Sequence, residues 1–218
     1  MPRPAAIASA VIASLSLLGG VLSGPAAAHP HVWISVETTL LYDKGAFVGL
    51  RHKWTFDQYY TAMAIEGLDK NKDGKYDREE LAELAKVNID GLKEFAYFTT
   101  ASVAGRQLKL ETASDYWLEY TNSLLSLNFT LPFAEPVPVQ SKGLSFAVQD
   151  PTFFIAFDLA KTDPAKLGPG APPACKLKIG AGKGEEGAAA LNDAFAKQFG
   201  ALAAAGGAQA ISVDCPGP

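Results

Sequence analysis

The residues with the clearest chemistry form one acidic stretch, Asp69 to Glu80. Its oxygen-bearing side chains and one glycine match positions 1, 3, 5, 6, 9 and 12 of an EF-hand calcium loop: Asp69, Asn71, Asp73, Gly74, Asp77 and Glu80. A calcium ion takes about six to eight oxygen ligands, and Lys75 would add its backbone carbonyl. Gly74 permits the sharp turn that a Cβ would oppose. The stretch therefore predicts a calcium site.

The simpler alternative is a solvated acidic turn between two helices. Six matched positions with helical patterns before and after them favour the calcium loop. Tyr76 stands where an aliphatic residue usually pairs with a second loop, and the sequence has no second loop of this kind. A solitary loop in an extracytoplasmic protein is expected to bind calcium weakly, with a Kd of about 10⁻⁴–10⁻³ M, and to act as a structural staple.

A second chemical feature depends on processing of the amino terminus. Arg3 precedes a nearly continuous apolar stretch at 5–22, which Gly24-Pro25 interrupts before three alanines that end at Ala28. This order is typical of a secretory signal peptide cleaved after Ala28, with an uncleaved membrane anchor as the alternative. We therefore expect a mature periplasmic protein that begins at His29 and has no membrane span.

Cleavage after Ala28 would expose two histidines, His29 and His31, with Pro30 between them. Neutral imidazoles bind zinc, nickel and copper, and the α-amine of His29 is a further donor. On a strand both rings project to the same face, whereas Pro30 removes the amide nitrogen that a square-planar amino-terminal site needs. The pair predicts a transition-metal site completed from elsewhere; the alternative is a frayed terminus with two solvated histidines.

His52, the remaining histidine, is the obvious third ligand, but the predicted hairpin opposes it. A two-residue turn at Lys44-Gly45 would place His52 opposite Glu37, about 20 Å along the strand from His31. We therefore expect His52 to pair with Glu37. A copper enzyme built on His29 would need a second histidine nearby, and no Ser-His-Asp arrangement stands out, so we predict that the protein is not an enzyme.

Cys175 and Cys215 are the only cysteines. An even pair in an exported chain predicts one disulfide, and the alternative, a two-thiolate metal site, lacks close spacing and nearby histidines. The composition, with 48% hydrophobic and 19% charged residues and a net charge of −4, predicts a folded chain. Because no long basic run occurs, we exclude a nucleic-acid partner.

The hydrophobic patterning predicts an α+β protein. Strand patterns at 31–42 and 46–56 flank a turn, helices are expected from Asp57 to Leu68 and from Arg78 onward, and strands return over 97–159. We expect a mainly antiparallel sheet with an inserted EF-hand-like helix–loop–helix. The tail offers strands at 175–179 and 210–215 around an alanine-rich helix near 188–204, which predicts a C-terminal βαβ-like segment closed by the disulfide.

These patterns divide the chain into three parts. Residues 1–28 form the predicted signal peptide. Residues 29–160 form a β-rich domain that carries the EF-hand-like insertion at 57–98. Residues 161–218, which begin with a stretch rich in proline and glycine, form the C-terminal segment with the disulfide.

Several segments together resemble a known family. His29-Pro30-His31-Val32-Trp33 follows the leader, Trp54-Thr55-Phe56-Asp57 precedes the first helix, and Asp150-Pro151-Thr152-Phe153-Phe154 lies between two strands. With the acidic loop, they resemble an uncharacterised periplasmic domain of unknown function. Its members are often labelled periplasmic components of an ABC-type transport system, and they are commonly encoded beside nickel/cobalt-type transporters. Some are implicated in zinc handling.

The resemblance implies a metal-delivery or metal-sensing accessory with no established enzymatic activity. We therefore expect a periplasmic protein that binds zinc, nickel or cobalt at His29 and His31 and works with an inner-membrane divalent-metal transporter, with calcium in the loop at 69–80. The alternatives are a calcium-stabilised interaction module without a transition-metal role, a copper enzyme, and a solute-capturing transport protein, for which the chain is short.

Overall fold

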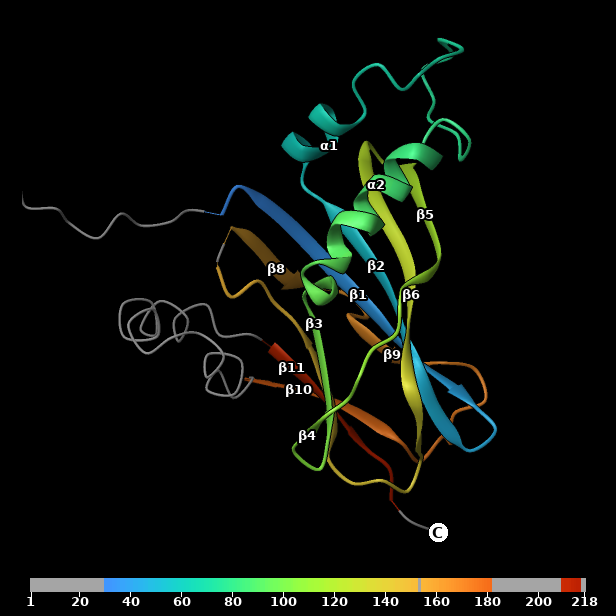
Figure 1. Cartoon of the computed structure of the whole chain (residues 1–218), viewed down its shortest axis with the longest axis vertical. Coiled ribbons are helices and arrows are strands. Elements are labelled where there is room, and N and C mark those ends of the chain that lie inside the picture. The colour runs from blue at the N-terminus through green and yellow to red at the C-terminus, as the bar shows by residue number, and fades with distance from the viewer. Residues whose placement is uncertain (1–29, 153, 182–208, 217–218) are drawn as a thin grey trace, which may run out of the picture.

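The structure, a computed structural model, describes residues 30–152, 154–181 and 209–216. Two β-sheets make up most of it (Figure 1). Sheet A has the order β5-β6-β2-β1-β8, with β9 also paired to β1, and its strands are β1 (Val32–Asp43), β2 (Ala46–Phe56), β5 (Ser114–Thr121), β6 (Leu124–Pro138), β8 (Ile155–Leu159) and β9 (Ala165–Leu167). Sheet B has the order β10-β11-β7-β3-β4, and its strands are β3 (Thr99–Val103), β4 (Arg106–Gln107), β7 (Leu144–Val148), β10 (Lys176–Ala181) and β11 (Gln209–Asp214).

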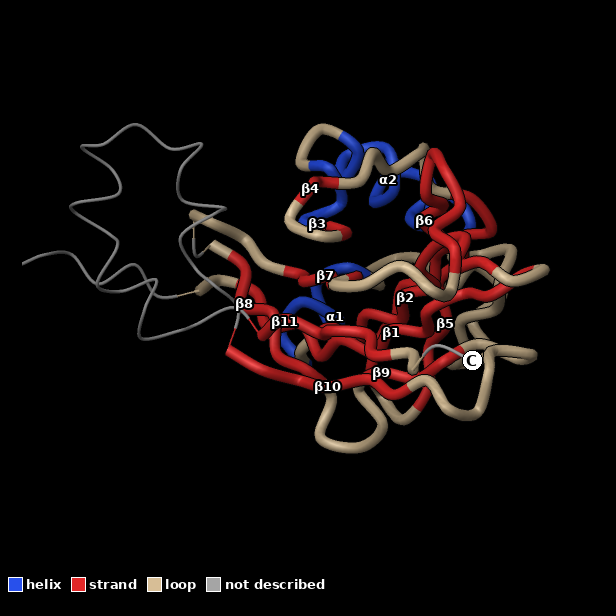
Figure 2. The backbone as a smooth tube through the Cα atoms, turned by 90° about the horizontal axis from the view of Figure 1, so that it is seen from below, coloured by secondary structure: helices blue, strands red, loops and turns tan. Residues whose placement is uncertain are grey.

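The predicted α+β class is wrong, because the described chain is mostly β. Its α-helices are α1 (Gln58–Ala64) and α2 (Ala82–Lys93), followed by the short 3₁₀ helix η1 (Ala96–Phe98), and Figure 2 shows how little of the chain they occupy. The expected helix–loop–helix insertion is not supported, since α1 has only seven residues. The chain turns away soon after it, where Gly67 adopts a φ of +76°.

The predicted C-terminal βαβ-like segment is also wrong. A βαβ unit joins parallel strands, whereas β10 and β11 are antiparallel neighbours with Lys176 opposite Asp214. The predicted disulfide is confirmed: Cys175 directly precedes β10, Cys215 directly follows β11, and their sulfurs are bonded. The alanine-rich helix expected near 188–204 lies outside the described residues.

The hairpin of β1 and β2 is confirmed, but its register differs from the expected one. The strands turn at Lys44 and Gly45, which both have positive φ. The pairing then shifts by one residue, because Gly49 follows Phe47 in the register and Val48 is skipped. This β-bulge places His52 opposite Thr38 and not opposite Glu37 as predicted, and it turns the imidazole into the core.

The core consists of two apolar clusters against one face of sheet A. At one end, sheet B packs on that face through Leu144, Phe146 and Ile211. At the other end α2 takes the place of sheet B and buries Ala85 and Ile89, four residues apart on one helical face, in the cluster that contains Trp54. Among the described residues, no helix has the length and apolar character needed to span a bilayer.

Candidate functional site

The loop at 69–80 is held in a bent shape by its own carboxylates. Asp69 reaches across the turn, so that Oδ1 accepts from the Asp73 N–H at 3.1 Å and Oδ2 from the Gly74 N–H at 3.0 Å. Gly74 has a φ of +77°, as the predicted sharp turn requires. The first and sixth positions of the motif are thus folded onto each other.

The other motif residues continue the same pattern. Asn71 Oδ1 accepts from the Asp73 N–H, and Asp73 Oδ1 accepts from the Lys75 N–H, each at 2.8 Å. Asp77 Oδ1 accepts from the backbone N–H groups of residues 79 and 80, at 2.8 and 2.9 Å. Each short polar side chain therefore stabilises the turn that follows it.

Glu80 closes the loop. Its Oε1 accepts from the backbone N–H groups of Lys70 at 2.8 Å and Asn71 at 3.3 Å, and its Oε2 accepts from the backbone N–H of Asp77 at 3.3 Å. The residue is 9% exposed, which is low for a glutamate on a surface loop. The twelfth position of the motif is therefore folded back onto the second, third and ninth.

The donor set fits a hard divalent cation, because it consists of carboxylate, amide and backbone oxygens. The carboxylates have not gathered into one coordination sphere: among the described residues, no three side chains of His, Cys, Asp or Glu lie close enough together to hold a metal ion. Calcium would be held by Asp69, Asn71, Asp73, Asp77 and Glu80 with the Lys75 carbonyl. Binding requires these oxygens to converge further.

Aromatic contacts attach the loop to sheet A. The Arg78 guanidinium lies 4.7 Å from the centre of the Trp117 ring on β5, and the Arg51 guanidinium of β2 lies 5.3 Å from the same ring. Tyr76, at the position where EF-hand loops usually pair, packs edge-on against Tyr120 of β5 at 4.9 Å. The loop is therefore fixed to the sheet by its own side chains.

The structure does not bring the histidines together. His29 lies outside the described residues, and the exposed His31 ring lies 4.8 Å from the Phe154 ring. His52 is fully buried in sheet A, where Nδ1 shares a hydrogen bond with Thr38 Oγ1 at 2.9 Å. Burial lowers the pKa of His52 to about 3, so the ring is neutral at ordinary pH. His52 is a core residue and does not belong to an amino-terminal metal site.

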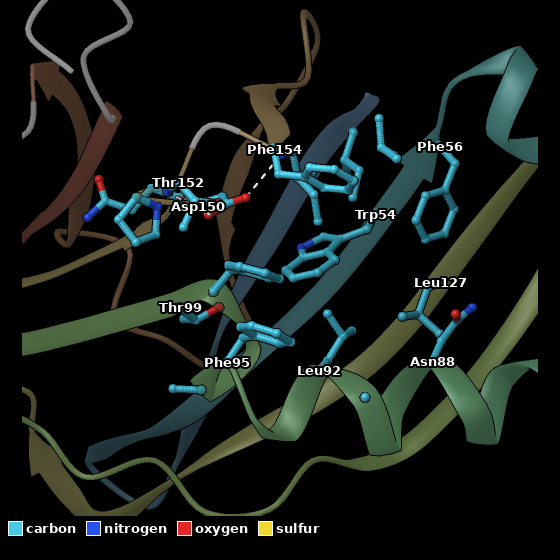
Figure 3. Close-up of a pocket in the computed structure, with 18 of the residues that line it drawn as sticks. Trp54, Phe56, Asn88, Leu92, Phe95, Thr99, Leu127, Asp150, Thr152 and Phe154 are labelled. Atoms are coloured by element: carbon cyan, nitrogen blue, oxygen red, sulfur yellow. Dashed lines mark hydrogen bonds between the residues drawn. The ribbon is translucent and has the colours of Figure 1, made fainter. Parts of the chain in front are cut away.

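A cavity of about 700 Å³ opens between sheet A, α2 and the turn at Asp150–Thr152 (Figure 3). We call it the apolar cavity. Trp54, Phe56 and Leu127 line it on the sheet side, and Leu92 and Phe95 line it on the helix side. The sequence analysis missed this feature, because its walls come from segments about a hundred residues apart. The one local signal was the Asp150-Pro151-Thr152 segment, noted only as part of a family resemblance.

The turn beside the cavity is held by Asp150. Its Oδ1 accepts from the backbone N–H of Thr152 at 2.8 Å and from the hydroxyl of the same residue at 2.7 Å, and its Oδ2 accepts from the Ile155 N–H at 3.0 Å. Asp150 is buried, and three hydrogen bonds satisfy its carboxylate. The carboxylate therefore positions this wall of the cavity.

Comparison with known proteins identifies the family. The sequence profile of a protein family of unknown function, DUF1007, matches residues 14–215, nearly the whole chain. The chain belongs to this family. The DUF1007 match confirms the expected membership of an uncharacterised family, whereas the periplasmic location and the link to a transporter stay predictions.

Two relatives of this DUF1007 protein illustrate how far the similarity extends. An uncharacterized protein of Haemophilus influenzae is 26% identical over 145 residues, which cover 66% of this chain and 69% of the relative. An uncharacterized 15.5 kDa protein in the trpE 3' region of Spirochaeta aurantia is 27% identical over 99 residues, which cover 45% of this chain and 70% of the relative. Neither name assigns an activity.

Proposed function

We propose that this DUF1007 protein is an exported calcium-binding protein in which the loop at 69–80 binds one calcium ion and thereby fixes α2 against sheet A. The observation that carries the proposal is the position of Glu80, whose carboxylate closes the loop onto Lys70 and Asp77. A glutamate at this place supplies two oxygens to a calcium ion at once.

The charge of the loop supports the proposal. The loop carries five carboxylates and four basic side chains, and the four carboxylates at motif positions, Asp69, Asp73, Asp77 and Glu80, would repel one another on converging at a single point. A divalent cation among them converts that repulsion into attraction. Calcium suits the site better than zinc or nickel, because the loop contains oxygen donors and neither His nor Cys.

The position of the loop gives the cation a structural consequence. Asp77 forms the turn that leads into α2, since the Leu81 N–H donates to the Asp77 carbonyl at 3.1 Å. Arg78 and Tyr76 attach the same segment to β5. A cation held between Asp69 and Glu80 therefore stabilises the start of α2 and its contact with the sheet. This is the calcium-stabilised module that the sequence left as an alternative.

Export and the transition-metal role, two further parts of the function expected from the sequence, differ in how far the structure supports them. The disulfide between Cys175 and Cys215 supports export, because such bonds persist in oxidising compartments. The transition-metal role of His29 and His31, with its transporter partner, stays a prediction to be tested at the amino terminus, and no geometry among the described residues adds to it.

Thermal unfolding with and without calcium tests the proposal. With a Kd of about 10⁻⁴ M, about 10 mM calcium stabilises the folded state by about 2.7 kcal/mol. For a chain of this size, that free energy raises the Tm by about 5–10 °C. We expect Glu80→Gln to abolish most of this rise, because it removes a charge from the coordination sphere.

Glu79→Gln is the matched control. It makes the same change of charge at the neighbouring residue, whose side chain is exposed and outside the motif positions. It should retain the calcium-induced rise in Tm. An equal rise in all three proteins would show that calcium acts elsewhere on the chain, and no rise in the unmodified protein would refute the proposal.

A further inference from the structure

We propose that the C-terminal half of α2 is a lid that closes onto the apolar cavity, and that η1 at Ala96–Phe98 is the strained hinge that allows this movement. The proposal does not depend on calcium binding, because the residues that carry it lie in α2, in η1 and on the walls of the cavity. The helix itself then fills the cavity. Backbone strain, unequal anchoring of α2 and exposed apolar side chains each support the movement.

The hinge is strained because all three of its residues have a positive φ. Ala96, Tyr97 and Phe98 have φ values of +49°, +54° and +47°. Residues other than glycine adopt this region singly, in turns, because a left-handed helix brings each Cβ too close to the following carbonyl oxygen. A run of three such residues, two of them aromatic, therefore stores strain. Strain of this kind is concentrated at binding sites and in segments that switch conformation.

Contacts with the rest of the fold hold the hinge in this conformation. The Tyr97 side chain is buried, and its hydroxyl oxygen accepts from the Ala113 N–H at 3.1 Å. The Tyr97 carbonyl accepts from the Thr99 hydroxyl at 2.8 Å, and the Phe98 carbonyl accepts from the Gln149 N–H at 2.9 Å. Because β3 begins at Thr99 and is paired with β7, it stays in place when the hinge relaxes. The movement therefore falls on α2.

The two halves of α2 are held to the fold unequally. Leu81, Ala85 and Ile89 are buried and anchor the start and the middle of the helix. None of residues 90–95 is buried, although this stretch crosses the cavity. Gly91 lies within it and has no side chain to pack, and glycine is the least rigid residue in a helix interior. The end of α2 that adjoins the hinge is therefore the end that is free to move.

Apolar side chains around the cavity provide a driving force for closure. Val87 and Phe95 on the helix and Phe154 on another wall (Figure 3) are 61, 60 and 55% exposed. The cavity of about 700 Å³ between them contrasts with the close packing of protein interiors. Movement of the helix toward Trp54 fills this space and buries the apolar side chains. Closure thus gains apolar burial and relieves strain, whereas the open arrangement keeps the hydrogen bonds of the hinge.

A distance measured between two spin labels by pulsed electron paramagnetic resonance tests the proposal. Glu94→Cys at the end of α2 and Asp158→Cys on β8 provide exposed attachment sites, and both native cysteines are bonded to each other. We expect two populations in this doubly labelled protein. One has the open arrangement described above, and the other has a shorter distance because the end of the helix has moved toward sheet A.

Substitutions at the exposed Ala96 should shift the two populations in opposite directions. Ala96→Gly removes the steric cost of a positive φ and should lower the ratio of closed to open protein by about fivefold. Ala96→Val should raise this ratio, because a branched side chain disfavours a positive φ more strongly. Ala104→Val is the matched control, because Ala104 is also exposed and has a φ of +50°, but lies in the turn between β3 and β4.

Opposite shifts in the two Ala96 variants, with an unchanged ratio in Ala104→Val, would support the hinge. Ala96→Gly relieves strain, so it folds and gives a result even where Ala96→Val does not. The proposal would be overturned by a single distance in the unmodified protein, by a second distance longer than the open one, or by equal populations in Ala96→Gly and the unmodified protein. An equal shift in Ala104→Val would also overturn it.

Discussion

His52 makes the stability of the fold depend on pH in a predictable direction. The imidazole is fully buried, and among the described residues Nε2 has no hydrogen-bond partner. A second proton would therefore be buried without an acceptor, which is why burial lowers the pKa from 6.5 to about 3. The unfolded chain keeps the ordinary pKa. Between about pH 6.5 and pH 3 it binds a proton that the folded chain does not, so the free energy of unfolding falls as the pH falls.

The magnitude follows from the two pKa values. With these two pKa values, the free energy of unfolding at about pH 5 should be about 2 kcal/mol lower than at about pH 7.5. Urea unfolding at both pH values measures it, with His52→Asn as the reference because Asn can still bond Thr38 but does not titrate. The unmodified protein should lose about 2 kcal/mol more than the variant over this range. Equal losses in the two proteins would refute the assignment of His52 as a neutral core residue.

Three further changes have expected outcomes. Replacing Cys175 and Cys215 by serine should lower the free energy of unfolding by about 4 kcal/mol in the chain-entropy relation for a separation of 40 residues, as urea unfolding measures. Asp57→Ala should cost about 1–2 kcal/mol in the same assay, because Asp57 caps α1 by accepting from two backbone N–H groups. Trp117→Ala should weaken calcium binding several-fold in a calorimetric titration, because it removes the ring against which Arg78 packs. An unchanged affinity would show that calcium binding by the loop does not depend on this contact.

Much of the β-structure could be predicted from local patterns. The turn at Lys44-Gly45 and the alternation in the flanking strands predicted the first hairpin, and Asp57 predicted the start of α1. The register could not be predicted, because a single skipped residue, Val48, decides it and no local composition marks that bulge. The wrong prediction that His52 pairs with Glu37 followed from this error in register, because a shift of one residue moves a side chain to the other face of a strand.

The wrong prediction of a C-terminal βαβ-like segment could have been avoided, because the positions of the two cysteines restrict how the two tail strands can pair. The disulfide joins the residue before β10 to the residue after β11, so the start of β10 lies beside the end of β11. Neighbouring strands have this arrangement only when they are antiparallel. Cys175 and Cys215 therefore argued against a βαβ unit. The apolar cavity, in contrast, depends on how α2 lies on sheet A, and that packing follows from contacts between distant segments and not from any motif.

The central claim is that the loop at 69–80 binds calcium, and isothermal titration calorimetry of the purified protein with calcium tests it most directly. We predict one site per chain in the unmodified protein and in Glu79→Gln, with a Kd of about 10⁻⁴–10⁻³ M, and no measurable site in Glu80→Gln. The absence of a saturable heat in the unmodified protein, or an identical titration for Glu80→Gln, would contradict the claim.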